Sequence, residues 1–123
     1  MLLNNFYSLT ELENSNDSSF KVLIHLNANH DIFKGHFPNN PVTPGVCMLQ
    51  IIKELIEKIV SKKLFMNQCS NVKFMALINP EVNPDLSISL EITENTANEY
   101  KVKSTTMFDE TVALKLVCNF KTI

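Results

Sequence analysis

One segment in the middle of the chain alternates apolar and polar residues with the period of an α-helix. Between Val46 and about Leu64, apolar residues recur every three or four positions, with mostly polar and charged residues between them. This spacing gives a helix a wide apolar face. Thr43 followed by Pro44 suits a helix start, with threonine as the N-cap and proline in the first turn. The pattern predicts one long helix whose apolar stripe is Met48, Ile51, Ile52, Leu55, Ile56, Ile59 and Val60.

Most of the remaining chain alternates with a period of two, which is typical of strands with one buried face. Asn-Pro pairs and short polar clusters separate these segments and predict turns. Ahead of the first clear strand, residues 6–9 suit either a short strand or a helix. We therefore expect an α+β fold in which an antiparallel sheet packs on one helix, within a single domain over 1–123. The expected strands lie at 20–26, 72–76, 86–92, 100–107 and 112–120.

Composition excludes several classes of protein. The net charge is −2 and all 11 basic residues are lysine, which argues against nucleic acid as the ligand because duplex binding needs a basic face. No apolar stretch approaches the roughly 20 residues of a membrane span, and the first residues do not resemble a secretory signal. Cys47, Cys69 and Cys118 are far apart, so we expect buried free thiols and neither a disulfide framework nor a zinc site. These features favour a cytoplasmic protein.

Candidate chemistry concentrates in the loop before the helix, over 28–45. This loop holds both glycines of the chain and three prolines spaced by three residues, so we expect it to be ordered. His36 lies in it, and an imidazole can take or give a proton near neutral pH, although a histidine bonded to loop backbone is the plainer interpretation. Gly45 lies in the first helical turn, where a ligand carbonyl can approach unpaired amides closely. His25 and His30 are expected to have structural roles, on a strand's polar face and in a turn.

This loop resembles the active-site signature of the 3-hydroxyacyl-[acyl carrier protein] dehydratases. Their pattern, G-H-F-P-x-x-P-x-x-P-G-V, has eight fixed positions, and 35–46 matches all of them. The resemblance extends over about 20–120, with the long helix following Pro-Gly and a strand entered near Asn71. It implies a hotdog fold, in which a sheet of five to six antiparallel strands wraps around one long central helix.

The resemblance also implies roles for individual residues. His36 matches the catalytic histidine that moves the proton at the substrate α-carbon, and the amide of Gly45 matches the group that holds the thioester carbonyl. The family carries a catalytic carboxylate five residues after this glycine, and here that position is Gln50, which cannot donate a proton at neutral pH. The catalytic residues expected here are therefore His36 and Gln50. The expected substrate contacts are Phe33, Phe37, Pro44, Gly45 and Val46.

Gln50 leaves four interpretations open. The first is a dehydratase of fatty acid or related acyl-chain biosynthesis, which removes water from a 3-hydroxyacyl thioester to give the trans-2-enoyl thioester, with Gln50 orienting a water. In the second, a paralogous subunit supplies the missing carboxylate opposite His36 in a heterodimer. The third is an acyl-thioester-binding module without turnover, and the fourth is a thioesterase. Glu54, one turn beyond Gln50, is expected to be a solvated or interface charge rather than a substitute acid.

The partners that the resemblance implies are an acyl carrier protein, with its acyl chain on a pantetheine arm, and a second copy joined edge to edge in a homodimer or larger oligomer. Neither a metal nor a redox cofactor is expected. Carrier proteins are generally acidic, so lysines near the site are candidates for docking, unless they are ordinary solvated side chains: Lys34, Lys62, Lys63 and Lys73. An apolar channel for the acyl chain would be lined by helix and loop residues, unless these are plain core: Met48, Ile51, Ile52, Leu55, Phe33 and Phe37.

Overall fold

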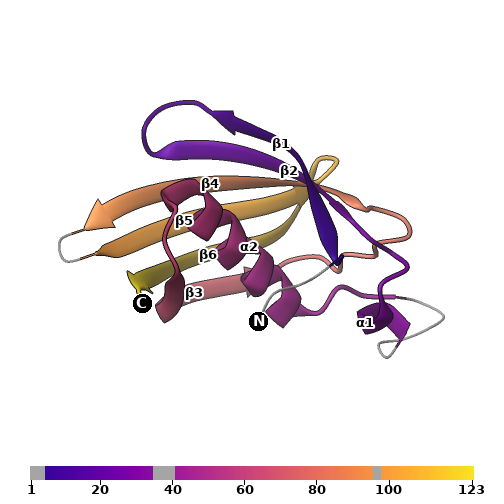
Figure 1. Cartoon of the computed structure of the whole chain (residues 1–123). Coiled ribbons are helices and arrows are strands. Elements are labelled where there is room, and N and C mark those ends of the chain that lie inside the picture. The colour runs from indigo at the N-terminus through magenta and orange to yellow at the C-terminus, as the bar shows by residue number, and fades with distance from the viewer. Residues whose placement is uncertain (1–4, 35–40, 96–97) are drawn as a thin grey trace.

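The computed structural model describes residues 5–34, 41–95 and 98–123, and six strands and two helices form within them. The strands are β1 Tyr7–Asn14, β2 Ser19–Leu26, β3 Leu64–Phe74, β4 Asp85–Asn95, β5 Glu99–Phe108 and β6 Thr111–Thr122, and the helices are α1 Asp31–Lys34 and α2 Gly45–Val60. All strand pairs are antiparallel, in the order β1-β2-β4-β5-β6-β3, so that β1 and β3 form the two edges. Helix α2 crosses one face of this sheet (Figure 1). The predicted α+β architecture is confirmed.

The apolar stripe of α2 and the inward faces of the strands meet in one core. Ile51 and Ile56 on the helix are fully buried, as are Val22 on β2 and Ile88 on β4. Phe6, just before β1, closes this core with no exposed surface. The alternation of apolar and polar residues therefore identified the buried faces of α2, β2, β4 and β6, because burial of apolar surface drives their packing. At 72–76 it did not, since Val72 is 36% and Phe74 is 54% exposed. Among the described residues, no helix is long and apolar enough to cross a membrane.

Both ends of the long helix differ from the sequence prediction. Pro44, with φ −61° and ψ 141°, is the N-cap, so the prediction of Thr43 as the N-cap is wrong by one residue. At the other end Ser61 adopts a left-handed conformation with φ 58°, which stops the helix at Val60 instead of near Leu64. The Leu64 amide then donates a 2.8 Å hydrogen bond back to the carboxylate of Glu57, so that the chain turns directly into β3.

The edge strands were the least predictable elements. Strand β3 begins eight residues before the expected start at residue 72, and its register with β6 shifts between Met66 and Gln68 and again between Cys69 and Asn71. Each irregularity breaks the period of two along the strand. Strand β1 has a similar shift after Leu9 and exposes most of its side chains. Neither strand therefore carries a clear alternating pattern.

Two of the three cysteines form a disulfide bond. Cys69 on β3 and Cys118 on β6 are register partners in the sheet and are bonded to each other. The prediction of free thiols is wrong for this pair, because the two cysteines are 49 positions apart in the sequence and nothing in it shows that their strands are neighbours. Cys47 is a buried free thiol, as expected, and its burial raises the pKa of the thiol.

Candidate active site

The amino end of α2 holds amides that have no acceptor within the helix itself. The Thr43 amide donates a 2.8 Å hydrogen bond to the carbonyl of Ile78, which ties the loop to the segment before β4. The Gly45 and Val46 amides occupy the first turn, where the helix itself provides no acceptor. No acidic side chain lies in this turn to offset the positive end of the helix dipole. The site can therefore stabilise a carbonyl oxygen that gains negative charge.

The ring of Phe74, the last residue of β3, lies against the first turn of α2. A Cβ atom on Gly45 would lie 2.7 Å from Cζ and 3.2 Å from Cε1 of the Phe74 ring. Only glycine leaves room for the ring at this distance. The Phe74 side chain, which is 54% exposed, therefore packs directly against Gly45. Sequence reasoning did not single out Phe74, because nothing in the sequence pairs these two positions.

Val46 and Gln50 extend the site along the helix. They are four residues apart, so their side chains lie one above the other on the same face of α2. Val46 is 73% exposed and Gln50 is half-buried. The structure thus brings three predicted site residues, Gly45, Val46 and Gln50, onto one turn and a half of helix, with Pro44 as their cap.

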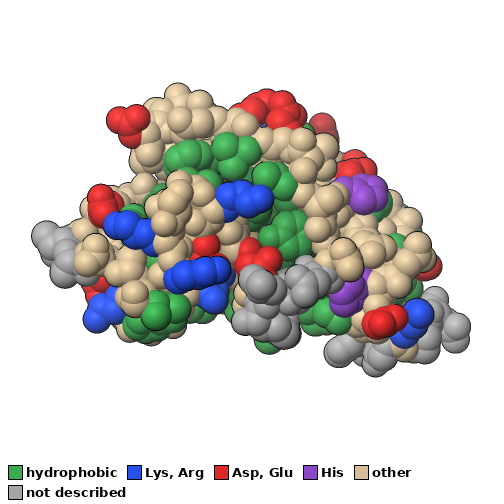
Figure 2. Space-filling view, in the orientation of Figure 1, with side chains coloured by type: hydrophobic (Ala, Val, Ile, Leu, Met, Phe, Trp, Pro, Cys, Tyr) green, Lys and Arg blue, Asp and Glu red, His purple; other side chains and the backbone are tan. Residues whose placement is uncertain are grey.

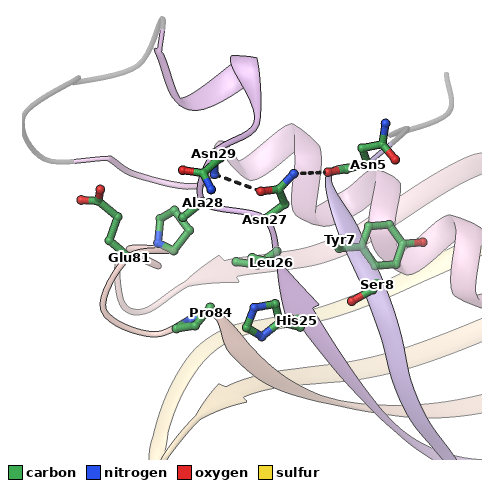
Figure 3. A pocket seen from close by; sticks show the side chains of 11 residues that line it. Asn5, Tyr7, Ser8, His25, Leu26, Asn27, Ala28, Asn29, Glu81 and Pro84 are labelled. Atoms are coloured by element: carbon green, nitrogen blue, oxygen red, sulfur yellow. Dashed lines mark hydrogen bonds between the residues drawn. The ribbon is translucent and has the colours of Figure 1, made fainter.

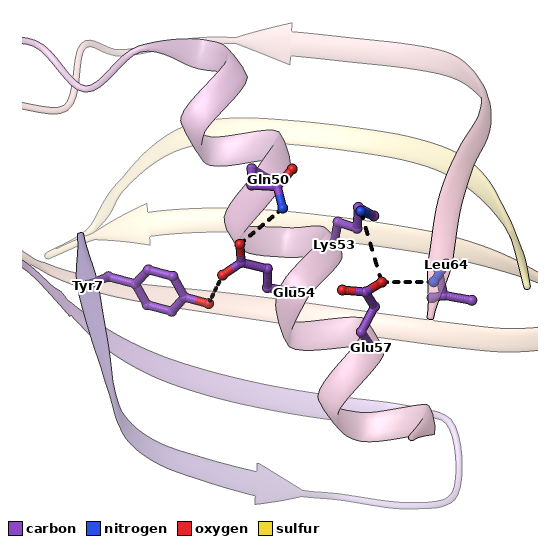
Figure 4. A network of polar contacts seen from close by, with 6 residues as sticks. All are labelled: Tyr7, Gln50, Lys53, Glu54, Glu57 and Leu64. Carbon is purple, nitrogen blue, oxygen red and sulfur yellow. Dashed lines mark hydrogen bonds and ion pairs between the residues drawn. The ribbon is translucent and has the colours of Figure 1, made fainter. Parts of the chain in front are cut away.

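Gln50 belongs to a network of polar contacts (Figure 4). Its amide nitrogen Nε2 donates a 3.0 Å hydrogen bond to Oε2 of Glu54, and the Tyr7 hydroxyl on β1 donates a 2.9 Å bond to Oε1 of the same carboxylate. Glu54 is half-buried and accepts both of these bonds, so it is not a freely solvated charge, while its place at an interface stays a prediction. Nothing in the sequence indicated the contact with Tyr7, because Tyr7 lies 47 positions before Glu54. The contact between Gln50 and Glu54 was predictable, since residues four apart on a helix are neighbours.

Tyr7 is a permanent donor in this network. Burial raises the pKa of its hydroxyl far above the ordinary value, and the hydrogen bond to Glu54 and the negative charge of that carboxylate raise it further. The proton therefore stays on Tyr7 throughout the physiological range, and the hydroxyl fixes one oxygen of Glu54.

A cavity of about 440 Å³ opens beside this network, between β1 and the carboxyl-terminal half of α2. Figure 2 shows hydrophobic side chains gathered between the β1–β2 hairpin and α2, with acidic and lysine side chains around them. The cavity is lined by Tyr7, Glu54, Glu57, Lys58, Ser61, Lys62 and Lys63. Its wall of mixed charge is separate from the apolar core.

Two of the predicted site residues, His36 and Phe37, lie outside the described residues. Phe33 lies on α1, where its ring stacks on Phe6 at a centroid distance of 5.1 Å and is 4% exposed. The imidazole of His30 accepts the amide of Ile32 at 3.1 Å and meets Phe6 edge-on, which agrees with its predicted role in a turn. The residues expected to line an acyl channel on the helix are instead packed in the core: Met48, Ile51, Ile52 and Leu55.

A second, open hollow of about 750 Å³ lies at the ends of β1 and β2 (Figure 3). There the Asn27 side chain donates to the carbonyl of Asn5 at 2.8 Å and accepts the amide of Asn29 at 3.0 Å. His25 pairs with Asp85 at 2.8 Å on the outer face of the sheet, as its predicted polar-face position requires. These bonds fix the point where the chain leaves β2 toward α1.

Among the described residues, no group of three or more histidine, cysteine, aspartate or glutamate side chains is placed to hold a metal ion.

Comparison with known proteins identifies the family. The family model described as ApeI-like, ApeI dehydratase, matches residues 12–113. The chain belongs to the ApeI-like dehydratase family. It is also similar to the 3-hydroxyacyl-[acyl-carrier-protein] dehydratases FabZ of Rickettsia felis and Rickettsia massiliae, with 31% identity over 102 residues and 30% over 105. These alignments cover 76% and 79% of the chain and 69% and 71% of the relatives.

Solved structures confirm the predicted hotdog fold of this ApeI-like chain. The dehydratase heterocomplex ApeI:P from Xenorhabdus doucetiae superposes with a TM-score of 0.79 at 18% identity, covering 93% of this chain and 96% of that one. An HP0420 homologue from Helicobacter felis superposes with a TM-score of 0.68 at 11% identity, covering 100% and 93%. The six strands and the central helix of the ApeI-like chain therefore have the hotdog arrangement.

Proposed function

We propose that the protein removes water from a 3-hydroxyacyl thioester carried on acyl carrier protein, giving the trans-2-enoyl thioester, in fatty acid or related acyl-chain biosynthesis. The observation that carries this proposal is the complete loop motif over 35–46, which runs directly into the amino end of α2 at Gly45. Membership of a dehydratase family and similarity to FabZ enzymes support it.

The reaction divides into a proton transfer and the departure of a hydroxyl group. In the first step His36 takes the α-proton, and the electron pair of the broken C–H bond passes into an enolate. The amides of Gly45 and Val46 stabilise the negative charge on the enolate oxygen. In the second step the enolate collapses, the α,β double bond forms and the β C–O bond breaks.

The leaving oxygen needs a proton that Gln50 cannot supply. In this proposal Gln50 instead holds a water, which gives a proton to the departing oxygen. The hydroxide that remains is neutralised by the proton on His36, so the products are the enoyl thioester, water and the resting enzyme. Loss of a dedicated general acid typically lowers a rate by about 10²–10⁴-fold, so we expect slow turnover.

A heterodimer is the second candidate. In the dimer that the sequence resemblance implies, the histidine of one subunit faces the helix residue of the other. A paralogous partner with a carboxylate at the position of Gln50 would then complete the site opposite His36. The observations that favour this candidate are Gln50 itself and the similarity of the fold to a protein from a dehydratase heterocomplex, ApeI:P.

The edge of β3 is the surface that we propose for pairing with a second subunit. β3 has a neighbour on one side only, since it ends the strand order. An unpaired edge with apolar side chains is a template for another strand. Large hydrophobic side chains are exposed along it and in the segment that follows: Phe65, Val72, Phe74, Met75 and Leu77.

Docking of an acidic carrier protein would use exposed lysines. Lys34 pairs with Asp31 at 3.3 Å, and the ammonium of Lys62 lies 5.8 Å from the centroid of the Tyr100 ring. Lys63 and Lys73 are also exposed. These lysines are therefore accessible from solvent, and we propose them as the carrier contacts.

The proposal is tested with the purified chain and a 3-hydroxyacyl thioester on acyl carrier protein, by following the absorbance of the conjugated enoyl thioester. We expect slow formation of product that His36→Ala abolishes. Activity that appears only after mixing with a carboxylate-bearing paralogue would support the heterodimer. Release of free thiol without enoyl product would instead identify a thioesterase and contradict the proposal.

A further inference from the structure

The side-chain amide of Gln50 is oriented by a contact with Glu54. Glu54 Oε2 accepts the hydrogen bond from Gln50 Nε2 at 3.0 Å, and Oε1 accepts the one from Tyr7 at 2.9 Å. The first bond lies within α2 and the second joins β1 to α2, and all three side chains are half-buried. The carboxylate is therefore bound through each of its oxygens to a different element.

The charge on Glu54 decides which end of the Gln50 amide faces outward. An ionised carboxylate only accepts hydrogen bonds, so the NH₂ group of Gln50 must face it. The amide oxygen then points away from Glu54, as Figure 4 shows. Tyr7 can only donate to Glu54 while it keeps its proton, and it does so over the physiological range. The two contacts together fix the side-chain amide of Gln50 in one orientation, with its oxygen facing away from Glu54.

We propose that Glu54, braced by Tyr7, is a positioning residue that presents the amide oxygen of Gln50 to the ligand, so that the site selects 3-hydroxyacyl over 3-oxoacyl groups. A hydroxyl group donates to this oxygen, whereas a 3-oxo carbonyl has no proton to donate and meets another acceptor. The choice of acyl thioesters as ligands rests on the proposed function. The selection itself rests on the contacts among Tyr7, Gln50 and Glu54.

Exchanging the Glu54 carboxylate for an amide should allow the side-chain amide of Gln50 to turn around. In the Glu54→Gln variant the Tyr7 hydroxyl, which can donate or accept, no longer faces a group that only accepts, so the new amide can turn its oxygen toward Tyr7. The NH₂ group of that amide then faces Gln50, and Gln50 turns its oxygen inward to accept it. The NH₂ group of Gln50 now faces the ligand and favours a 3-oxo carbonyl. A purely structural defect would weaken both ligands and would not improve the binding of one.

The experiment measures the Kd of two unreactive ligands by calorimetry: 3-hydroxyhexanoyl and 3-oxohexanoyl pantetheine in which an amide replaces the thioester. We expect the wild-type chain to prefer the hydroxy ligand by roughly tenfold, the size of one hydrogen bond. In Glu54→Gln the 3-oxo ligand should bind more tightly than it binds the wild type. Gln50→Ala should remove the preference, and adding Glu54→Gln to it should change nothing further.

Glu57→Gln is the matched control. Glu57 is the next carboxylate on the helix, but it accepts the Leu64 amide and pairs with Lys53 at 3.9 Å. This variant makes the same chemical change without altering the Gln50 contact, so the preference should remain. Selective ¹⁵N labelling adds a readout without ligand, since the chain has two glutamines, Gln50 and Gln68. Glu54→Gln should move the side-chain amide signals of Gln50 and leave those of exposed Gln68 in place.

The outcomes separate the two proposals. A preference that persists in Glu54→Gln overturns the positioning role, whatever the turnover. A preference that depends on Glu54, in a chain that forms no enoyl product, supports the positioning role and contradicts the proposed reaction. If neither ligand binds the wild-type chain, both the ligand class and this inference are wrong.

Discussion

Gln50 occupies the position at which the sequence resemblance implies a catalytic carboxylate. Its amide can orient a hydroxyl group or a water but cannot give up a proton near neutral pH. The structure adds that a carboxylate is 3.0 Å away, on Glu54, bound to the amide nitrogen of Gln50. The nearest carboxylate on the helix therefore lies one turn beyond Gln50 and is engaged in a hydrogen bond to it. The proposed reaction relies instead on a water held by Gln50, so we expect slow turnover.

Gln50→Glu should restore an acid to the site. It would place two carboxyl groups at about 3 Å from each other, and such a pair retains one proton because both cannot ionise together. We expect dehydration to accelerate by about 10²-fold or more, as measured by the rate of enoyl thioester formation. Gln50→Met, which has a similar length and no acid, is the control. An equal rate in the glutamate variant and the wild type would contradict the role given to this position.

Tyr7 should make stability depend on pH at the alkaline end. An unfolded tyrosine loses its proton near pH 10, whereas the raised pKa of Tyr7 keeps the folded protein protonated there. The unfolded state then binds fewer protons than the folded state, so stability falls as the pH rises above 10. Urea unfolding between pH 8 and pH 11 should show a steeper loss for the wild type than for Tyr7→Phe. Parallel losses in the two proteins would contradict the buried contact with Glu54.

At the scale of elements, the sequence predicted the parts with regular periods best. The stripe on α2 and the alternation on β4 identified buried faces that the structure confirms, such as Ile51 and Ile88. Strand β3 was predicted from residue 72 only, because bulges interrupt its period and its outward side chains are not consistently polar. The four-residue α1 is too short to carry a helical pattern. The prediction therefore failed for α1 and for the first half of β3, where the apolar residues follow no regular period.

The disulfide between β3 and β6 should contribute measurably to stability. It joins residues 49 positions apart, which by chain-entropy arguments corresponds to about 4 kcal/mol in the free energy of unfolding. We expect the double variant Cys69→Ala, Cys118→Ala to lose about this much in urea unfolding. Reductant should have a similar effect on the wild type and none on the variant. If reductant leaves the wild type unchanged, the two cysteines are not bonded in the purified protein.

At the scale of the whole molecule, the strand order determines which surfaces are available for assembly. The sequence indicated five to six strands but not that β3 lies at the edge beside β6, because this pairing joins residues far apart in the chain. The contacts of Tyr7 with Glu54 and of Phe74 with Gly45 could not be predicted for the same reason, since each joins residues far apart in the sequence. The motif over 35–46 predicts where the site lies, and the tertiary contacts around Gly45 and Gln50 came only from the structure.

Assembly through β3 is tested by placing a charge on that edge. Val72 on β3 is 36% exposed, and Leu12, on the opposite edge strand β1, is 40% exposed, so the two suit matched changes. We expect Val72→Lys to shift the protein from dimer toward monomer in sedimentation velocity, because a buried unpaired lysine opposes strand pairing. Leu12→Lys should leave the dimer intact. Dissociation by Leu12→Lys alone would place the interface on the other edge.

The central claim is that the chain keeps the proton-transfer half of a dehydratase and lacks a dedicated acid for the other half. The most direct test is to incubate the protein with a 3-hydroxyacyl thioester on acyl carrier protein in D₂O and measure both deuterium at the α-carbon and enoyl product. We predict that deuterium enters faster than product forms, and that His36→Ala abolishes both. Substrate that remains free of deuterium while the wild-type chain binds it would contradict the account.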